Sequence, residues 1–275
     1  MSDIKSCFLS RFPEGQLVEV DFSQLEVVCL ALLANDPVLK SDLVSGLDMH
    51  RIRAADLFCI PETEVTKSQR TLAKRLSFQL QYGAGAASMA KKNKISKAIA
   101  QRFIDNYYDR YPRVKEWQAE IAKSVTESRV QSGRRTISGV PAGQGEYVSP
   151  TGRIYRFFEY DAPDWKPGGV PSFSPTEMKN YPIQGFATAD VMAVFRGLVF
   201  RRIFKANEQA YCLMVNTVHD SVMFDCATDA AVDWLEHTCR DIAASLPREL
   251  EARWPVTIDL PLPITFKSGR RWSDL

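Results

Sequence analysis

The stretch Val18-Glu19-Val20-Asp21-Phe22-Ser23-Gln24-Leu25-Glu26 (residues 18–26) determines how the rest of the chain is interpreted. Its first half is rich in valine, which favours a short strand. After Asp21 the apolar residues recur at helical spacing as far as Leu33, so the strand leads directly into a helix. Asp21 therefore lies at the end of a buried strand, a rigid position from which a carboxylate can bind a metal ion. Considered alone, such an aspartate is more often a helix cap.

A second stretch places Arg70, Lys74, Phe78 and Tyr82 four residues apart, with Gly83 at its end. Each step of four advances about 40° around a helix, so two cations and two rings share one stripe. Core packing explains the rings but not the cations, and a solvated face explains the cations but not the rings. A stripe with both suits a nucleotide, because cations bind phosphates and a ring packs on the base. An ordinary amphipathic helix explains the stripe about equally well when it is considered alone.

A third stretch joins two predicted strands, 211–215 and 221–225, through the segment 216–220, which contains His219 and Asp220. A His-Asp pair in a hairpin is usually just a turn. The hairpin can nevertheless bring Asp220 beside Asp21, where two carboxylates repel unless cations lie between them. Mg²⁺ uses one or two carboxylates plus substrate phosphates, and two ions about 3.5–4 Å apart would stabilise phosphoryl transfer.

Together these stretches resemble the polymerase domain of the family A DNA polymerases, the group of bacterial DNA polymerase I and many bacteriophage replicases. Residues 21–26 are similar to the family's first palm motif, 70–83 to its fingers-helix motif and 218–220 to its second palm acid. Shorter matches follow in the same order from about residue 8 to the end of the chain. These are Asp48-Met49-His50, Arg110-Tyr111-Pro112, Thr151-Gly152-Arg153, Asn180-Tyr181-Pro182-Ile183-Gln184-Gly185 and Gly269-Arg270-Arg271-Trp272.

The resemblance implies a catalytic role for the two palm acids and the fingers cations. Asp21 and Asp220, helped by the main-chain carbonyl of Phe22, would bind two Mg²⁺ ions. One ion would activate the primer 3′-hydroxyl, and both would carry the charge of the transition state. Arg70 and Lys74 would bind the triphosphate, and Lys74 would also donate a proton to pyrophosphate.

The resemblance also implies contacts with the nucleotide and the DNA. Phe78 would pack on the incoming nucleotide, and Glu26 would exclude a 2′-hydroxyl and so favour dNTPs. Tyr82 would stack at the templating position, where Gly83 allows close approach of the backbone. The remaining residues that would contact the primer-template or the primer end, largely without sequence preference, are Gln24, Asn180, Gln184 and His219.

Some positions depart from the family pattern. Ser221 and Val28 stand where the family usually has Glu and Arg, and Ser77 and Gln79 replace its usual Asn and Gly. None of these changes removes an expected metal ligand, so we expect activity with altered efficiency or fidelity. Phe78 in place of Tyr predicts discrimination against dideoxynucleotides, which chain-termination ratios would measure.

The predicted elements give an α+β fold: an antiparallel palm sheet with helices that carries a mainly helical fingers insertion. We expect residues 1–34 to form the first part of the palm, 35–176 the fingers and 177–275 the second part of the palm. A β-rich region is expected at 130–160, a loop at 161–175 and an edge strand at 256–267. The expected helices are 37–46, 48–58, 67–81, 96–111, 112–129, 177–207 and 228–246.

The composition of the chain only weakly restricts its fold class and function. The chain has 275 residues, of which 45% are hydrophobic, enough for a substantial core, and its net charge of +2 neither requires nor excludes nucleic acid. The six cysteines form no CxxC pair and lie mostly in apolar runs, so we expect reduced thiols in a cytoplasmic protein and no zinc site. No segment of the sequence suggests a membrane span.

A thumb, the first palm strands and an exonuclease domain do not fit in the first 16 residues, so the resemblance covers only the C-terminal part of a polymerase. The resulting hypothesis is a split DNA polymerase, most plausibly from a bacteriophage and working in the host cytoplasm. It would add dNTPs to primer-template DNA, with its N-terminal half (thumb and exonuclease) on a separate chain. The exposed edge of the palm sheet would bind that chain.

Three other classes of protein are also consistent with parts of the sequence. A non-catalytic DNA-binding or assembly subunit could retain the fold. Loss of catalytic function is argued against because the chain retains all four expected catalytic and triphosphate-binding residues, Asp21, Asp220, Arg70 and Lys74. A single-subunit RNA polymerase shares the palm chemistry, but Glu26 favours DNA synthesis. A metal-dependent nuclease could use two aspartates but has no use for the stripe at 70–82.

Overall fold

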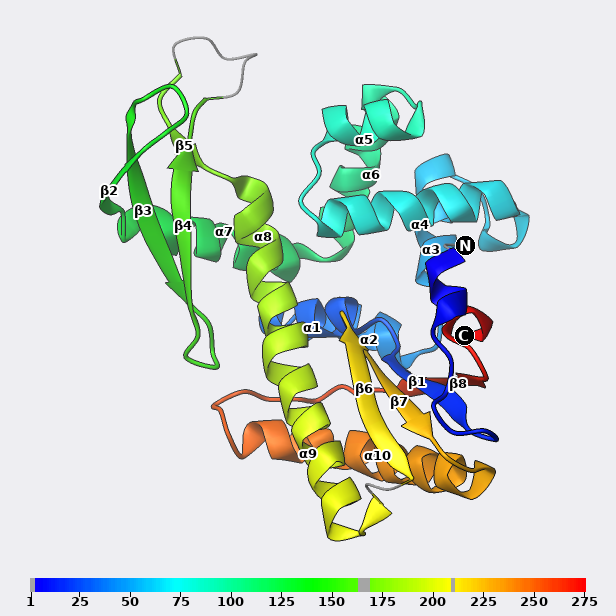
Figure 1. Ribbon diagram of the computed structural model, residues 1–275. Coiled ribbons are helices and arrows are strands. Elements are labelled where there is room, and N and C mark those ends of the chain that lie inside the picture. Colours follow the sequence, from blue (N-terminus) through cyan, green and yellow to red (C-terminus); the bar gives the residue numbers. More distant parts are fainter. Residues whose placement is uncertain (1–2, 163–168, 209–210) are drawn as a thin grey trace. The chain divides into compact units, whose positions relative to one another are not determined.

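The computed structural model describes residues 3–162, 169–208 and 211–275. The chain forms two compact units. Unit 1 consists of Met1–Cys29 and Gly185–Leu275, and unit 2 consists of Leu30–Gln184. The helix α1 (Leu25–Ala34) contains the first boundary between them. The α+β fold class is confirmed, because both units combine helices with an antiparallel sheet (Figure 1).

Unit 1 is built on an antiparallel sheet with the strand order β6-β7-β1-β8. The N-terminal strand therefore lies between strands from the C-terminal third of the chain. The strands are β1 (Gln16–Phe22), β6 (Cys212–Val218), β7 (Ser221–Cys226) and β8 (Ile264–Gly269). The helical segments are η1 (Asp3–Cys7), the π-helical turn η3 (Gly185–Val191), α9 (Met192–Lys205), α10 (Asp229–Glu251) and η5 (Trp272–Asp274).

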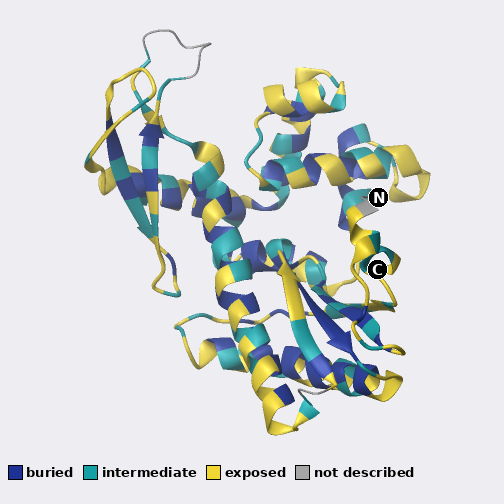
Figure 2. Ribbon diagram, viewed as in Figure 1, coloured by how far each residue is buried: buried dark blue, intermediate teal, exposed yellow. Residues whose placement is uncertain are grey.

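One face of β1 forms part of the core of unit 1. Val18 and Val20 are completely buried, and the ring of Phe22 meets that of Phe195 on α9 edge-on, with centroids 4.9 Å apart. The neighbouring strand β7 is buried along its whole length (Figure 2). Successive side chains of a strand point to opposite faces, so burial of this set fixes the register of β1 and places Asp21 on the other face.

Unit 2 contains most of the helices and a second antiparallel sheet, with the strand order β2-β3-β4-β5. Its helices after α1 are α2 (Pro37–Val44), α3 (Met49–Phe58), η2 (Glu62–Glu64), α4 (Lys67–Gln81), α5 (Ala86–Asn93), α6 (Lys97–Arg110), α7 (Pro112–Glu127) and α8 (Pro175–Gln184). Its strands are β2 (Val130–Arg135), β3 (Pro141–Val148), β4 (Ile154–Tyr160) and β5 (Ser172–Phe173).

Local signals account for the start of two helices in unit 2. Thr66 and Gln69 form a capping box at the start of α4: the Gln69 amide donates to Thr66 Oγ1 at 3.3 Å, and the Thr66 amide donates to Gln69 Oε1 at 2.9 Å. Asp36 caps α2 by accepting from the amides of Val38 and Leu39. The helix expected at 67–81 is confirmed as α4.

Two elements of unit 1 extend further than the sequence predicts. Strand β6 continues through Val218, with a register shift between Met214 and Asn216, so the predicted loop 216–220 shrinks to two residues. Helix α10 continues past Pro247 to Glu251. In both cases pairing or burial of the following residues outweighs the local signal for a break.

Other predicted boundaries also change. The segment 84–92, for which no element was expected, forms most of α5, which ends at Asn93, and the predicted strand 256–267 begins only at Ile264. Strand β8 does lie at the edge of its sheet, as the prolines at 261 and 263 predict. The expected loop 161–175 contains β5, and its residues 163–168 lie outside the described part of the chain.

One helical run in the described residues, Pro175–Lys205, is long and apolar enough to cross a membrane by length and composition, with a mean hydropathy of 1.3 over its most apolar window. Of that window, 44% is buried inside the protein. A buried core helix passes the same test, so the run makes no case for a membrane protein.

Candidate active site

Strand pairing in unit 1 brings the two predicted palm acids to the same end of the sheet. Asp21 is the register partner of Ser221, the residue that follows Asp220. The amide of Phe22 donates a hydrogen bond of 3.2 Å to the main-chain carbonyl of Asp220. Residues about 200 positions apart in the sequence are thus neighbours, because β1 and β7 are adjacent antiparallel strands.

The electrostatics of this pair indicate that it can bind cations. The pKa of Asp21 is raised to about 6, first by burial and then by the negative charges of Asp220 and Glu19, while Lys267 lowers it. Lys267 lies opposite Glu19 on β8, with its Nζ 3.4 Å from Glu19 Oε2. A divalent cation bound to both aspartates would remove their repulsion and favour the ionised form of Asp21.

The donor set of the pair fits Mg²⁺. Asp21 and Asp220 offer carboxylate oxygens, which Mg²⁺ prefers as ligands. In the part of the chain that the structure describes, no cluster of three or more His, Cys, Asp or Glu side chains is arranged for a metal ion. The pair therefore suits an ion that takes its other ligands from water and substrate phosphates, as Mg²⁺ commonly does.

The remaining predicted residues of unit 1 lie near the same end of β1. Gln24 has a left-handed backbone (φ 56°), and its carbonyl accepts from the amides of Val27 and Val28 at 3.0 Å. Glu26 lies in the first turn of α1. His219 is exposed in the β6–β7 turn, also with a left-handed backbone (φ 52°).

The buried thiol of Cys29 reports how the charges of unit 1 are distributed. Its pKa is raised, first by burial and then by the negative charges of Glu26, Asp190 and Asp220. The negative charges of Glu26 and Asp220 therefore both influence the same buried thiol, that of Cys29. Asp190, which is 3% exposed in the turn η3, adds a buried acid to this region that the sequence analysis did not single out.

In unit 2, α4 presents the predicted stripe on its exposed side. Phe78 and Tyr82 are 43% and 42% exposed. The Lys74 ammonium lies 5.7 Å from the centre of the Phe78 ring. The opposite face of α4 is buried through Ala73, Leu76, Ser77 and Leu80. The helix thus buries one face without using the aromatic rings of the stripe, which remain accessible to a ligand.

Helix α3 adds two residues to the stripe that the sequence analysis noted only as part of a short match. Asp48 Oδ2 lies 2.5 Å from Arg70 Nε. The ring of His50 lies 6.1 Å from that of Phe78. The pKa of His50 is lowered to about 4, first by burial and then by nearby cations that include Lys74 and Arg70. The triplet Asp48-Met49-His50 was the signal that could have identified both residues.

The other predicted residues of unit 2 lie at the end of α4 and on α8. Gly83 has a left-handed backbone (φ 76°), and Thr176 Oγ1 donates to its carbonyl at 3.3 Å. Asn180 is 6% exposed, and its buried Nδ2 has no hydrogen-bond partner. Gln184 is the last residue of α8.

Comparison with known proteins identifies the family. The sequence profile of DNA polymerase family A matches residues 1–274. The chain belongs to DNA polymerase family A. This family A chain is 27% identical to DNA polymerase I of Geobacillus stearothermophilus over 273 residues, which are 98% of this chain and 27% of that protein. It is 28% identical to DNA polymerase I of Pseudomonas aeruginosa over 272 residues, or 98% of this chain and 26% of that protein.

A viral enzyme is also similar to this family A chain. The DNA polymerase of Bacillus phage SP01 is 26% identical over 278 residues, which cover 99% of this chain and 28% of that protein. Because bacterial and phage enzymes match equally well, a bacteriophage source stays a prediction. The chain spans about a quarter of the length of these relatives, and nothing in the matches supports a separate N-terminal polypeptide.

A solved structure shares the fold of this family A chain. It is the polymerase domain of Pol1 from M. smegmatis, in complex with DNA primer-template and dNTP. The two structures superpose with a TM-score of 0.69 at 24% sequence identity, over 98% of this chain and 42% of the other. The similarity confirms the polymerase fold inferred from the three sequence stretches.

Proposed function

We propose that this chain catalyses the nucleotidyl-transfer step of template-directed DNA synthesis, in which a primer 3′-hydroxyl attacks the α-phosphate of a dNTP and pyrophosphate leaves. The observation that carries the proposal is the pairing of β1 with β7, which makes Asp21 and Asp220 neighbours at one end of the sheet. Membership of DNA polymerase family A supports the same reaction.

In this proposal each unit supplies one part of the chemistry. Unit 1 is the palm and unit 2 is the fingers; the expected palm segments 1–34 and 177–275 lie close to the unit boundaries after Cys29 and Gln184. Primer-template DNA and dNTPs are the ligands of the similar Pol1 structure, and we propose them as the ligands of this chain.

Asp21 and Asp220 would hold two Mg²⁺ ions through their carboxylates, with a further oxygen from the Phe22 carbonyl. When bound, the ions supply activation of the 3′-hydroxyl and neutralisation of the charge that develops on the phosphate. Burial of Asp21 beside Asp220 suits this task, because a partly buried anionic site binds cations more strongly than one in open water.

Arg70 and Lys74, the two cations of the α4 stripe, both bind the triphosphate, but each has a different role. Arg70 is held by Asp48 and grips phosphate oxygens through its planar guanidinium. Lys74 binds as a compact charge and can give a proton to the leaving pyrophosphate. Phe78 packs against the nucleotide, and His50 is neutral at pH 7 because its pKa is about 4, so it can donate one hydrogen bond without adding charge.

The remaining predicted residues select the nucleotide and hold the DNA. Glu26, in the first turn of α1, excludes a 2′-hydroxyl, and Tyr82 stacks at the templating position with Gly83 beside it. The residues that contact the primer-template or the primer end are Gln24, Asn180, Gln184 and His219.

Primer extension tests the proposal directly. The wild-type chain and Asp233→Asn, which removes the same charge from an exposed position of α10, are expected to extend a primed template with Mg²⁺ and dNTPs. Asp220→Asn is expected to lose at least 10³-fold in rate (roughly 4 kcal/mol), because one of the two carboxylates that would hold the metal ions is lost. Binding of Mn²⁺ without DNA, followed by electron paramagnetic resonance, should fall in parallel. Extension that survives in Asp220→Asn would contradict the proposed acid pair.

A further inference from the structure

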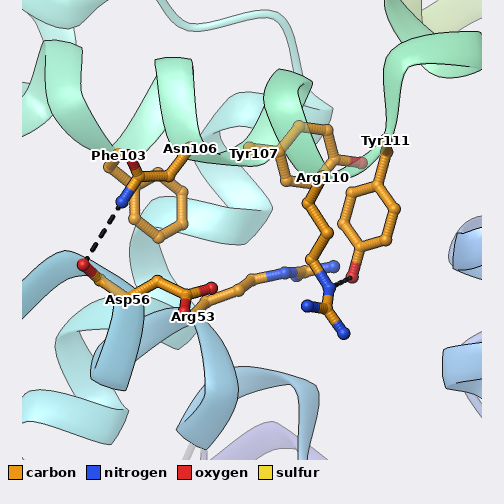
Figure 3. A pocket seen from close by; sticks show the side chains of 7 residues that line it. All are labelled: Arg53, Asp56, Phe103, Asn106, Tyr107, Arg110 and Tyr111. Atoms are coloured by element: carbon orange, nitrogen blue, oxygen red, sulfur yellow. Dashed lines mark hydrogen bonds between the residues drawn. The ribbon is translucent and has the colours of Figure 1, made fainter. Parts of the chain in front are cut away.

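The pocket between α3 and α6 in unit 2 is a feature of helix packing. It lies where the two helices meet, and Asn106 Nδ2 on α6 donates across it to the Asp56 carbonyl on α3 at 3.3 Å (Figure 3). Its free space holds about one water molecule, so it has no room for a larger ligand. The reactive groups that the proposed function leaves unused lie in unit 1.

Unit 1 brings two of the six cysteines of the chain into contact. Cys212 is the first residue of β6, Cys226 is the last residue of β7, and the two are register partners. Their sulfur atoms lie 3.9 Å apart. Both residues are buried, with exposures of 1% and 0%. The proposed nucleotidyl transfer uses neither thiol.

The backbone around this pair has the spacing that a disulfide requires. The amide of Ala227 donates to the carbonyl of Tyr211 at 2.8 Å, and these two residues flank the cysteines. In an antiparallel ladder this bond makes Cys212 and Cys226 a pair without mutual main-chain hydrogen bonds, for which the Cα atoms are about 4.5 Å apart. Disulfides span Cα distances of about 4.4–6.8 Å, so rotation of the two side chains can bring the sulfurs to the bonding distance of about 2.0 Å.

The hydrogen bonds of the two thiols give them different reactivity. The Cys212 thiol donates to the Ala231 carbonyl at 3.5 Å. The pKa of Cys212 is lowered, because Cys226 donates a hydrogen bond to its sulfur, although burial opposes this shift. The pKa of Cys226 is raised, first by the same hydrogen bond and then by burial. Cys212 is therefore the thiol that forms a thiolate more easily, and the thiolate is the nucleophile.

The position of the pair gives a small oxidant a route to it. Both cysteines lie at the open end of the β6–β7 hairpin, away from the turn that contains Asp220. Tyr211, which precedes Cys212, is 52% exposed. The ends of elements open locally at a lower free-energy cost than their centres. Such opening admits a molecule as small as hydrogen peroxide.

We infer that Cys212 and Cys226 form a peroxide-sensitive site that closes to a reversible disulfide. The Cys212 thiolate attacks a peroxide oxygen, so that an S–O bond forms, the O–O bond breaks and the departing hydroxide takes up a proton. The Cys226 sulfur then attacks the sulfenic sulfur. The S–S bond forms, the S–O bond breaks, and hydroxide leaves with the Cys226 proton as water. Two thiols and one hydrogen peroxide thus give one disulfide and two water molecules.

Mass spectrometry of the full chain tests the inference. The chain is treated with hydrogen peroxide, denatured in N-ethylmaleimide and digested without reductant. Trypsin leaves Cys212, Cys226 and Cys239 together in the peptide 206–240, so Asp-N protease, which cleaves before aspartates, is added to separate them. We expect peptides joined through Cys212 and Cys226 in most molecules, and their separation by dithiothreitol.

The exposed cysteines Cys7 and Cys59 show whether the peroxide dose was sufficient. Oxidation of these two while Cys212 and Cys226 both carry maleimide would overturn the inference. Equal amounts of Cys226 linked to Cys239 and to Cys212 would also overturn it, because the geometry assigns one partner.

Two alanine variants that each remove one buried thiol provide the matched comparison. Cys29→Ala should form the link to the wild-type extent. Cys212→Ala should leave Cys226 as its maleimide adduct, because the attacking thiolate is missing. If Cys212→Ala does not fold, the measurement on the wild-type chain decides by itself, since it identifies the linked residues directly.

Hydrogen exchange measures what the disulfide does to the hairpin. The bond closes the end of β6 and β7 opposite the turn that holds Asp220, and so restricts local opening of the two strands. We expect the amides of the segment 212–226 to exchange roughly ten-fold more slowly after oxidation and to recover after dithiothreitol. Identical exchange in the oxidised and reduced chains would overturn the inference that the bond restrains this hairpin.

Discussion

Asp48 performs two tasks with its two carboxylate oxygens. Oδ1 caps α3 by accepting from the Arg51 amide at 3.1 Å, and Oδ2 pairs with Arg70 Nε at 2.5 Å. Burial alone would raise the pKa of Asp48, but the bonds from Arg70 and Arg51 lower it below its usual range. A helix cap on one element thus orients the guanidinium that we propose as a triphosphate ligand on the next.

We predict that Asp48→Asn raises the KM for dNTP two- to five-fold and leaves kcat nearly unchanged. The amide oxygen can still cap α3, but the charge that orients Arg70 is lost, and a partly exposed ion pair contributes about 0.2–1 kcal/mol. Steady-state primer extension measures both parameters. Asp109→Asn, at an exposed position of α6, is the matched control and should change neither. A lower KM would mean that Asp48 competes with the triphosphate rather than positioning Arg70.

Among the elements, those set by local signals could be predicted from the sequence. Helix α4 begins at its capping box, and its stripe follows from the helical period alone. Helix α10 could not be bounded in this way: Pro247 predicts a break, but Leu246 and Leu250 on either side are fully buried and hold the helix together. Burial of the flanking residues thus allows the helix to continue through a proline that by itself favours a break.

The junction after α4 requires a glycine for two reasons, a left-handed backbone and a close contact with Thr176. Gly152 has the left-handed backbone without the close contact, so comparing the two positions distinguishes the two effects. Gly83 has φ +76°, and a Cβ there would lie 2.7 Å from the Thr176 Cα. Gly152 has φ +77° but would meet nothing within 4 Å. We predict that Gly83→Ala lowers the free energy of unfolding by about 2–4 kcal/mol and Gly152→Ala by only about 1 kcal/mol. Urea unfolding of both variants measures the difference, and equal losses would show that the contact with Thr176 relaxes easily.

At the scale of the whole molecule, the acid pair depends on contacts that no local pattern encodes. Unit 1 joins the first 29 residues to the last 91, since it consists of Met1–Cys29 and Gly185–Leu275. Hydropathy and turn signals predict that β1 and β7 exist, but not that Asp21 lies opposite Ser221. The hairpin pattern showed that the two acids could be neighbours, and the resemblance to family A turned that possibility into an expectation. The contacts of Asp48 and His50 with α4 likewise could not be predicted from local patterns, because they depend on how α3 packs.

Unit 2 has a long-range hydrogen-bond network centred on Asp42, and the titration of this carboxylate gives the last prediction. Asp42 on α2 accepts from Arg110 and Tyr111. Burial alone would raise its pKa, but these hydrogen bonds lower it below the usual value near 3.9. A carboxylate whose pKa is lower in the folded than in the unfolded state stabilises fully above the unfolded pKa. That stabilisation disappears as the pH falls through the folded pKa.

We therefore predict that Asp42→Asn lowers the free energy of unfolding at pH 7 by about 2–3 kcal/mol, because it leaves Arg110 without its counter-charge; the value is below that of a fully buried pair since Arg110 is 32% exposed. The difference between wild type and variant should shrink as the pH is lowered from about 4 towards 2. Urea unfolding at a series of pH values measures it, with Asp109→Asn as the control that removes an exposed charge of α6. A difference that stays constant down to pH 2 would show that Asp42 contributes through packing rather than through its charge.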